Sequence, residues 1–183
     1  MIMSPNESTP AVFLDRDGTL MEEVNYCSDP AKVRVFAGVP EALGQLKAAG
    51  FKLIVISNQA GIGRGYFTEK EYRAVEAELA RQVRPAVLDA TYFCRDHPDR
   101  PTDYRKPAPG MILEAQRDHH LDLARSFFIG DKAIDMECGR NADVRTILVK
   151  TGYGAAEHER AGANWVAEDF PGAAAIVLAQ ANE

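Results

Sequence analysis

The stretch Ala11-Val12-Phe13-Leu14-Asp15-Arg16-Asp17-Gly18-Thr19 decides the fold class. Its residues up to Leu14 are apolar and end abruptly at charged residues, which is typical of a short buried strand. Asp15 and Asp17 then follow in a turn that Gly18 opens. One carboxylate of such a pair can bind a metal ion while the other transfers a proton. Taken alone, these residues are also compatible with a solvated acidic turn.

Apolar runs of strand length alternate with segments of helical character along the rest of the chain. Further strands are expected at 51–56, 90–93, 126–129 and 145–149, and helices at 38–49, 68–83, 110–120 and 134–141. Thr68 and Glu71 have the spacing of a helix-capping box. Such alternation predicts an α/β fold with a doubly wound, mainly parallel sheet and helices on both faces. The ligand site of such a sheet lies beyond the carboxyl ends of its strands.

The composition is that of one globular domain. Of the 183 residues, 46% are hydrophobic and 26% are charged, and no apolar run approaches the roughly 20 residues that cross a bilayer. Residues 1–10 are polar and lack the features of a secretory signal. We therefore expect a disordered lead-in over 1–10, a single domain over 11–183, a cytoplasmic location and no membrane partner.

Charge and cysteine content narrow the function classes further. The net charge of −6 argues against non-specific nucleic-acid binding, which depends on Lys and Arg side chains. Cys27, Cys94 and Cys138 are too few and too scattered for a disulfide framework, so we expect free thiols.

Polar side chains also follow the second predicted strand. Ser57-Asn58-Gln59 leads into a glycine-rich turn at 60–65. A hydroxyl and exposed backbone N–H groups there can bind phosphoryl oxygens. This signal is weak by itself, because glycine-rich turns more often only join a strand to a helix.

Two further segments add charge at this edge of the sheet. Asp131 follows the strand 126–129, and with Asp15 it would form a hard oxygen site suited to Mg²⁺. Close carboxylates resist ionisation without a cation, which favours a metal there. Arg105 and Lys106 lie in the irregular stretch 94–109. If that stretch folds over the strand ends, both can stabilise a phosphoryl group.

Taken together, these segments resemble the ordered motifs of the haloacid dehalogenase superfamily of phosphotransferases. The motifs are Asp15-Arg16-Asp17-Gly18-Thr19, Ser57-Asn58-Gln59, Lys106 and Gly130-Asp131-Lys132-Ala133-Ile134-Asp135. The match spans nearly all the chain. Residues 58–65 and 105–111 further resemble the branch that contains the phosphatases of heptose 1,7-bisphosphate and of histidinol phosphate. The resemblance implies a Rossmann-like fold without a large cap domain.

The resemblance also implies a Mg²⁺-dependent phosphomonoester hydrolase that acts through an aspartyl-phosphate intermediate. Asp15 would attack phosphorus, and Asp17 would protonate the leaving oxygen and later activate water. Ser57 and Lys106 would bind the phosphoryl oxygens. Mg²⁺ would be held by Asp15, by the backbone carbonyl of Asp17 and by Asp131. Asp135 is expected to support these ligands rather than bind the metal.

The substrate pocket is assigned by the same resemblance. Its expected lining is Glu23, Val24, Asn25, Tyr26, Ser57, Asn58, Gln59, Ala60, Arg105, Lys106 and Lys132. The expected reaction removes the 7-phosphate of D-glycero-D-manno-heptose 1,7-bisphosphate in nucleotide-activated heptose and lipopolysaccharide biosynthesis, carried out by a monomer. Histidinol phosphate or another small sugar phosphate is the alternative substrate, and a catalytically idle binding module of the same fold is the alternative from another class.

One departure from the family pattern concerns zinc. Many relatives hold a structural zinc in the loop before the Arg-Lys pair through a cysteine, a histidine and two later cysteines. Cys94 and His97 are present here, but Thr102 and Tyr104 stand where the later cysteines would be. Structural zinc normally needs four donors, so we expect no zinc.

Overall fold

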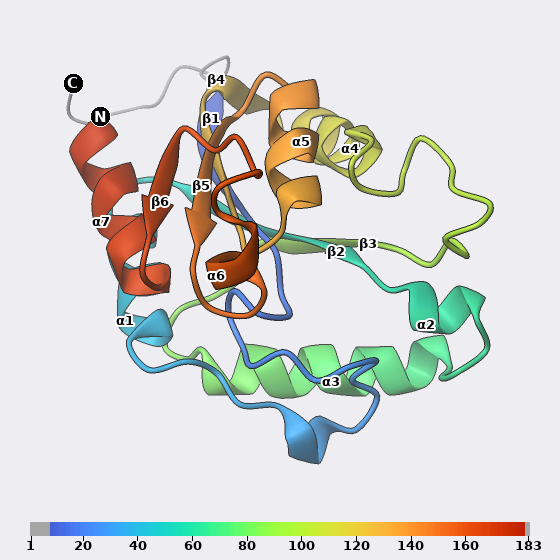
Figure 1. Ribbon diagram of the computed structural model, residues 1–183. Coiled ribbons are helices and arrows are strands. Elements are labelled where there is room, and N and C mark those ends of the chain that lie inside the picture. Colours follow the sequence, from blue (N-terminus) through green and yellow to red (C-terminus); the bar gives the residue numbers. More distant parts are fainter. Residues whose placement is uncertain (1–7, 182–183) are drawn as a thin grey trace.

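A parallel sheet forms the centre of the computed structural model, which describes residues 8–181 (Figure 1). Its six strands lie in the order β3-β2-β1-β4-β5-β6. The strands are β1 (Thr9–Leu14), β2 (Lys52–Asn58), β3 (Ala90–Cys94), β4 (Leu121–Gly130), β5 (Arg145–Val149) and β6 (Trp165–Ala167). The strand order reverses between β1 and β4, and in open α/β sheets the ligand crevice lies at such a switch point.

Helices cover both faces of the sheet, as the sequence predicts. One face packs against α1 (Val39–Ala48), α3 (Glu69–Gln82) and α7 (Phe170–Gln180), and the other packs against α4 (Gly110–His119) and α5 (Ala133–Asn141). Short helices complete the chain: a 3-10 turn at Pro30–Lys32, α2 (Ala60–Gly63) and α6 (Gly154–Glu157).

Strand β1 shows why the sheet is buried on both sides. Val12 and Leu14 point into the core shared with α1, α3 and α7, whereas Ala11 and Phe13 point into the core shared with α4 and α5. Successive side chains of a strand alternate between faces, so an unbroken apolar run fits a sheet covered on both sides. The predicted strand assignment is thereby confirmed.

Strand boundaries differ from the expected ones mainly in β1 and β4. Thr9 and Pro10 were expected in the disordered lead-in but pair in β1 with Leu121 and Asp122, while residues 1–7 of that lead-in lie outside the described residues. The register of this pair shifts between Pro10 and Val12. The Ser126 hydroxyl accepts a hydrogen bond from the N–H of Ala11 at the irregularity. Strand β4 therefore begins five residues earlier than the apolar run 126–129 indicates.

Helix α7 was not anticipated from the sequence. Its segment FPGAAAIVLAQ is apolar nearly all round and gives little helical periodicity. Only the start of the helix has a sequence signal, a capping residue followed by a proline. The Asp169 side chain accepts from the N–H of Gly172, and Pro171 stands in the first turn. The helix packs against α1 and completes one layer of the fold.

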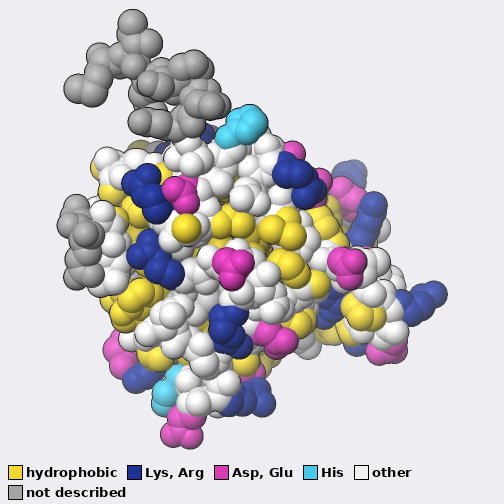
Figure 2. Space-filling model, turned by 90° about the horizontal axis from the view of Figure 1, so that it is seen from above, with side chains coloured by type: hydrophobic (Ala, Val, Ile, Leu, Met, Phe, Trp, Pro, Cys, Tyr) yellow, Lys and Arg dark blue, Asp and Glu magenta, His cyan; other side chains and the backbone are white. Residues whose placement is uncertain are grey.

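The edge of the sheet opposite the strand carboxyl ends carries mixed charge. In Figure 2, which views the molecule from above Figure 1, Lys and Arg side chains are scattered among acidic and apolar ones. This face therefore offers no continuous basic surface. None of the helices within residues 8–181 has both the length and the apolar character that crossing a bilayer requires.

Candidate active site

The predicted catalytic residues meet at the switch point of the sheet. Asp15 follows β1 directly, and Asp131 follows β4, the neighbouring strand. Ser57 lies near the end of β2 on the other side of β1. Lys106 comes from the loop between β3 and α4, which folds back over these strand ends.

Lys106 is the central cation of the site. Its ammonium group lies 2.7 Å from Asp15 Oδ1 and 2.7 Å from Asp135 Oδ1, and it donates to the carbonyl of Ile56 at 3.0 Å. The Lys106 side chain is almost fully buried, so its charge is stabilised by these anions rather than by water. Burial disfavours the charged amine, but the two carboxylates outweigh that effect and raise the pKa of Lys106.

Asp15 is held ionised in this environment. Burial alone would raise its pKa, but the positive charges of Lys106 and Lys132 outweigh burial and lower it. A charged carboxylate is the form that a nucleophile requires. The arrangement therefore fits the predicted role of Asp15.

Asp131 has a buried carboxylate oxygen that could bind a cation. Its Oδ2 accepts from the N–H of Tyr153 at 2.9 Å, whereas its Oδ1 is buried and has no partner among the described residues. Burial, and next the charge of Asp15, raise the pKa of Asp131 to about 8. A buried oxygen without a hydrogen bond beside a second carboxylate is unfavourable unless a cation binds there.

Three neighbouring carboxylates could hold a metal ion. Asp15, Asp131 and Asp135 each offer an oxygen within 4.8 Å of the others. Both oxygens of Asp135 are already used, Oδ1 by Lys106 and Oδ2 by the N–H of Lys132. Asp15 and Asp131 are thus the better ligands, and Asp135 fits a supporting position. Hard oxygen donors of this kind suit Mg²⁺.

Two glycines allow the loops around Asp131 to approach one another. Gly18 has a φ of +84°, and a Cβ at this position would collide with Asp131 Oδ2. Gly152 has a φ of +56° and the same conflict. The hydroxyl of Thr151 donates to the carbonyl of Gly18 at 2.7 Å and joins the two loops. Only residues without a side chain permit this close contact.

Asp17 is oriented by Arg16, which was not among the predicted site residues, and by Gln59, which was predicted only as a substrate-binding residue. Arg16 donates to both carboxylate oxygens, at 3.0 and 3.1 Å, and is itself fully buried under the ring of Tyr72. Gln59 donates to Asp17 at 3.2 Å and to the hydroxyl of Ser57 at 2.8 Å. The predicted proton donor is thereby fixed from two sides. No sequence signal separated Arg16 from an ordinary surface arginine.

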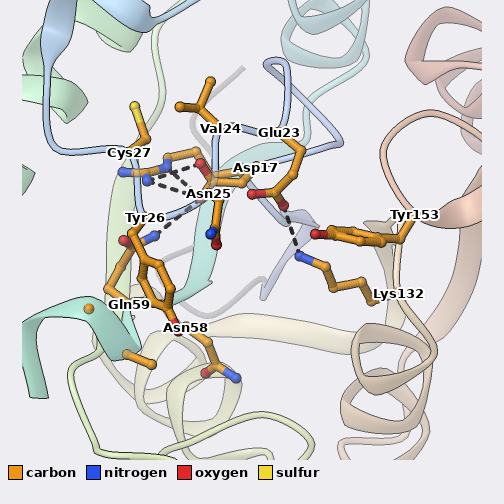
Figure 3. Close-up of a pocket in the computed structure, with 13 residues that line it drawn as sticks. Asp17, Glu23, Val24, Asn25, Tyr26, Cys27, Asn58, Gln59, Lys132 and Tyr153 are labelled. Carbon is orange, nitrogen blue, oxygen red and sulfur yellow. Dashed lines mark hydrogen bonds and ion pairs between the residues drawn. The ribbon is translucent and has the colours of Figure 1, made fainter. Parts of the chain in front are cut away.

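A cavity of about 220 Å³ opens beside these residues (Figure 3). Most of the predicted substrate-binding residues line it: Glu23, Val24, Asn25, Tyr26, Asn58, Gln59, Ala60 and Lys132. Arg16, Asp17, Cys27, Gly61 and Tyr153 line it as well. Glu23 and Lys132 form an ion pair of 3.1 Å across it. Ser57, Arg105 and Lys106 are not in this lining.

Asn58 connects the cavity to the Lys106 loop. Its amide donates to the carbonyl of Lys106, and its carbonyl accepts from the N–H of Lys106, both at 3.1 Å. Arg105 lies half-buried in the same loop, and its Nη1 has no partner among the described residues. The structure thus explains how Lys106 is positioned but gives Arg105 no defined ligand.

The loop that precedes Arg105 is organised by hydrogen bonds. Thr102 donates from its N–H and its hydroxyl to Asp96, at 2.8 and 2.6 Å. The sulfur of Cys94 accepts from the N–H of Asp96, and a ring nitrogen of His97 accepts from the N–H of Asp99. Thr102 therefore stabilises the loop through hydrogen bonds to Asp96. The absence of zinc stays a prediction.

The chain is similar in sequence to known phosphatases. Residues 103–173 match the HAD-hydrolase-like family. The D-glycero-beta-D-manno-heptose-1,7-bisphosphate 7-phosphatase of Yersinia pestis is 38% identical over 170 residues, 87% of this chain and 90% of the relative. The protein of the same name from Escherichia coli strain K12 is 38% identical over 87% of this chain and 89% of its own.

Solved structures show the same fold. The D,D-heptose 1,7-bisphosphate phosphatase of B. bronchiseptica, complexed with magnesium and phosphate, has a TM-score of 0.87 and 28% identity and covers 93% of this chain and 99% of that one. The corresponding enzyme from Burkholderia thailandensis has a TM-score of 0.71 and 26% identity over 92% and 98% of the two chains. Within residues 8–181 no large cap domain interrupts the fold. The chain is therefore a phosphatase of the haloacid dehalogenase superfamily, and within it belongs to the family of the D-glycero-D-manno-heptose-1,7-bisphosphate 7-phosphatases.

Proposed function

We propose that this phosphatase removes the 7-phosphate of D-glycero-D-manno-heptose 1,7-bisphosphate, through an aspartyl phosphate on Asp15 and with Mg²⁺ bound. The substrate assignment rests on the similarity to heptose-bisphosphate phosphatases over 87% of the chain. The pathway, nucleotide-activated heptose synthesis for lipopolysaccharide, follows from the same substrate.

The mechanism rests on the contact between Lys106 and Asp15. Lys106 keeps the Asp15 carboxylate ionised and oriented, and its ammonium group lies where it can bind oxygens of the phosphoryl group that Asp15 attacks. Asp17, which Arg16 and Gln59 orient, donates a proton to the departing sugar oxygen. Asp17 then takes a proton from the water that hydrolyses the aspartyl phosphate.

Mg²⁺ would be held by the carboxylates of Asp15 and Asp131 and by the backbone carbonyl of Asp17. When bound there, Mg²⁺ would neutralise charge on the phosphoryl oxygens and on the clustered carboxylates. Asp135 and Lys132 hold the neighbouring groups in place, because each is bonded within the cluster or across the cavity. Substrate enters through the 220 Å³ cavity, where Glu23 to Tyr26 and Asn58 to Ala60 surround the sugar.

A substrate panel tests the assignment. Phosphate release is measured from heptose 1,7-bisphosphate in both anomers, histidinol phosphate and other sugar phosphates, each with Mg²⁺ and with chelator. We expect kcat/KM for one heptose bisphosphate to exceed the others by at least about a hundredfold, or ~2.7 kcal/mol of transition-state discrimination. Mg²⁺-dependent release led by histidinol phosphate would contradict the heptose assignment and leave the mechanism standing.

Replacement of the nucleophile tests the mechanism. Asp15→Asn removes the attacking carboxylate, so kcat should fall by about a thousandfold or more. Asp99→Asn makes the same chemical change at an exposed loop position and should leave kcat unchanged. Activity that survives in Asp15→Asn would rule out the aspartyl phosphate.

A further inference from the structure

Tyr153 is an aromatic residue at the cavity that none of the catalytic roles above uses. It follows β5 and lies just before α6. Its side chain lines the cavity, yet the residue is 48% exposed. Its hydroxyl forms no hydrogen bond that the described residues supply. An exposed ring of this kind contributes little to the core, so its position calls for another explanation.

The backbone of Tyr153 is tied to the catalytic centre. Its N–H donates to Asp131 Oδ2 at 2.9 Å. The preceding Gly152 packs against Gly18, and Thr151 donates to the Gly18 carbonyl. These contacts fix the Tyr153 backbone relative to the metal-binding carboxylate. The ring consequently has a defined place at the cavity rather than that of a freely moving loop residue.

The ring of Tyr153 also restrains Lys132. The Lys132 ammonium lies 4.8 Å from the ring centroid and 3.1 Å from Glu23 Oε2. Figure 3 shows the Lys132 ammonium next to the Tyr153 ring and joined to the Glu23 carboxylate by a dashed line. A cation on an aromatic face is attracted by the ring quadrupole. Lys132 is thus held at the cavity from two sides.

The opposite side of the cavity carries a second aromatic ring. Tyr26 is 39% exposed and packs edge-to-face on Tyr66 with 4.8 Å between ring centroids. In Figure 3, Tyr26 and Tyr153 lie on either side of Asn25. Sugars present C–H groups that pack on aromatic faces and hydroxyls that bond to polar neighbours. The cavity therefore combines an aromatic surface with an anchored cation.

We propose that Tyr153 is a specificity-determining residue that packs its ring against the sugar of the substrate. This inference rests on the proposed function, since it requires a sugar phosphate as substrate. A small phosphate without a sugar would not contact the Tyr153 ring. Without the Tyr153 ring, Lys132 still has its ion pair with Glu23 and stays near Asp15. Tyr153 should therefore affect sugar binding and leave the phosphoryl-transfer step unchanged.

Steady-state kinetics of Tyr153 variants test this inference. We expect Tyr153→Leu to raise KM for heptose 1,7-bisphosphate about fivefold, with kcat within about twofold of wild type. Its KM and kcat for acetyl phosphate, which has no sugar, should match wild type. Tyr153→Phe keeps the ring and should bind the sugar phosphate as wild type does. Tyr92→Leu, which removes a tyrosine bonded to Asp118 outside the cavity, is the matched control.

The outcomes separate this inference from the proposed function. If Tyr153→Leu changed KM equally for heptose bisphosphate and acetyl phosphate, the role of Tyr153 would be purely structural and the inference would be overturned. Strong heptose-bisphosphate hydrolysis with an unchanged KM in that variant would overturn this inference alone. A wild-type enzyme that prefers no sugar phosphate over acetyl phosphate would overturn both. Thermal unfolding of each variant identifies any that fail to fold.

Discussion

At the scale of single residues, the site depends on Lys106 as a buried counter-ion. It contacts Asp15 and Asp135, both of which are buried. When one member of a buried ion cluster is removed, the remaining charges lose their compensation, which costs more than the ion pairs themselves contribute. Catalysis and folding should therefore depend on the same ammonium group.

Lys106→Met tests this dual dependence. The change keeps the length of the side chain but leaves two buried carboxylates facing each other, so we expect a loss of about 3–5 kcal/mol in the free energy of unfolding. Loss of a phosphoryl-oxygen donor should also lower kcat by about a hundredfold or more. Urea unfolding and phosphate release measure the two effects. Added Mg²⁺ should restore part of the stability, because it supplies a cation to Asp15.

The control is Lys70→Met, the same change at an exposed position of α3. It should change neither the free energy of unfolding nor kcat by much. If Lys106→Met were inactive but as stable as wild type, the carboxylates would not need the lysine for folding, and the ion-cluster interpretation would be wrong.

At the scale of elements, the irregular stretch between β3 and α4 is held by side-chain hydrogen bonds. Asp96 receives two hydrogen bonds from Thr102, and the Thr102 hydroxyl in turn accepts from the N–H of Tyr104 at 3.2 Å. Asn58 fixes the far end of the stretch through the backbone of Lys106. The bonds among Asp96, Thr102 and Tyr104 are local, so this part of the stretch can open without unfolding the sheet.

Thr102→Val should loosen this loop. The change preserves shape but removes a hydroxyl that both donates and accepts, so we expect amide hydrogen exchange over residues 96–104 to accelerate about tenfold. The melting temperature should change little, because the sheet and its helices do not depend on this hydroxyl. Thr102→Ser retains the hydroxyl and serves as the control. Equal exchange in both variants would mean that other contacts order the loop.

The elements also show what the sequence could predict. Strands β1 and β5 each contain an unbroken apolar run, 11–14 and 147–149, and α3 begins with a complete capping box, so local pattern is sufficient for them. The early part of β4 and helix α7 depend on tertiary contacts instead. Residues 121 and 122 become a strand by pairing with β1, and α7 is stabilised by packing against α1.

Some residues of the candidate site were likewise predictable from the sequence, and others were not. Asp15, Asp131 and Lys106 were predictable because each belongs to a recognisable motif at a strand end or in the adjacent loop. Arg16 stands in the same motif as Asp15, but its burial under Tyr72 was not predictable, nor was the position of Tyr153 beside Lys132. Sequence spacing carries no information about these contacts.

At the scale of the whole molecule, the buried carboxylates couple protonation, stability and metal binding. The pKa of Asp131 is raised from 3.8 to about 8, by burial and next by Asp15, and that of Asp135 to about 6, for the same two reasons. In the metal-free protein the folded state therefore keeps protons that the unfolded state has lost. Stability from these groups is fully present below about pH 4 and is lost as the pH rises through 6 and then 8.

The metal-free protein should accordingly lose thermal stability between pH 5 and pH 8, whereas saturating Mg²⁺ should remove or reverse this trend. Mg²⁺ requires ionised carboxylates, so its binding should release about one proton at pH 7 and tighten as the pH rises. Melting curves with and without Mg²⁺, and calorimetric titrations in buffers of different ionisation enthalpy, measure both effects. Asp131→Asn should bind Mg²⁺ weakly and release no proton on binding. It should also stabilise the metal-free protein at pH 8, because it removes the buried carboxylate whose Oδ1 has no partner among residues 8–181. Equal pH dependence in wild type and Asp131→Asn would show that other groups govern the coupling.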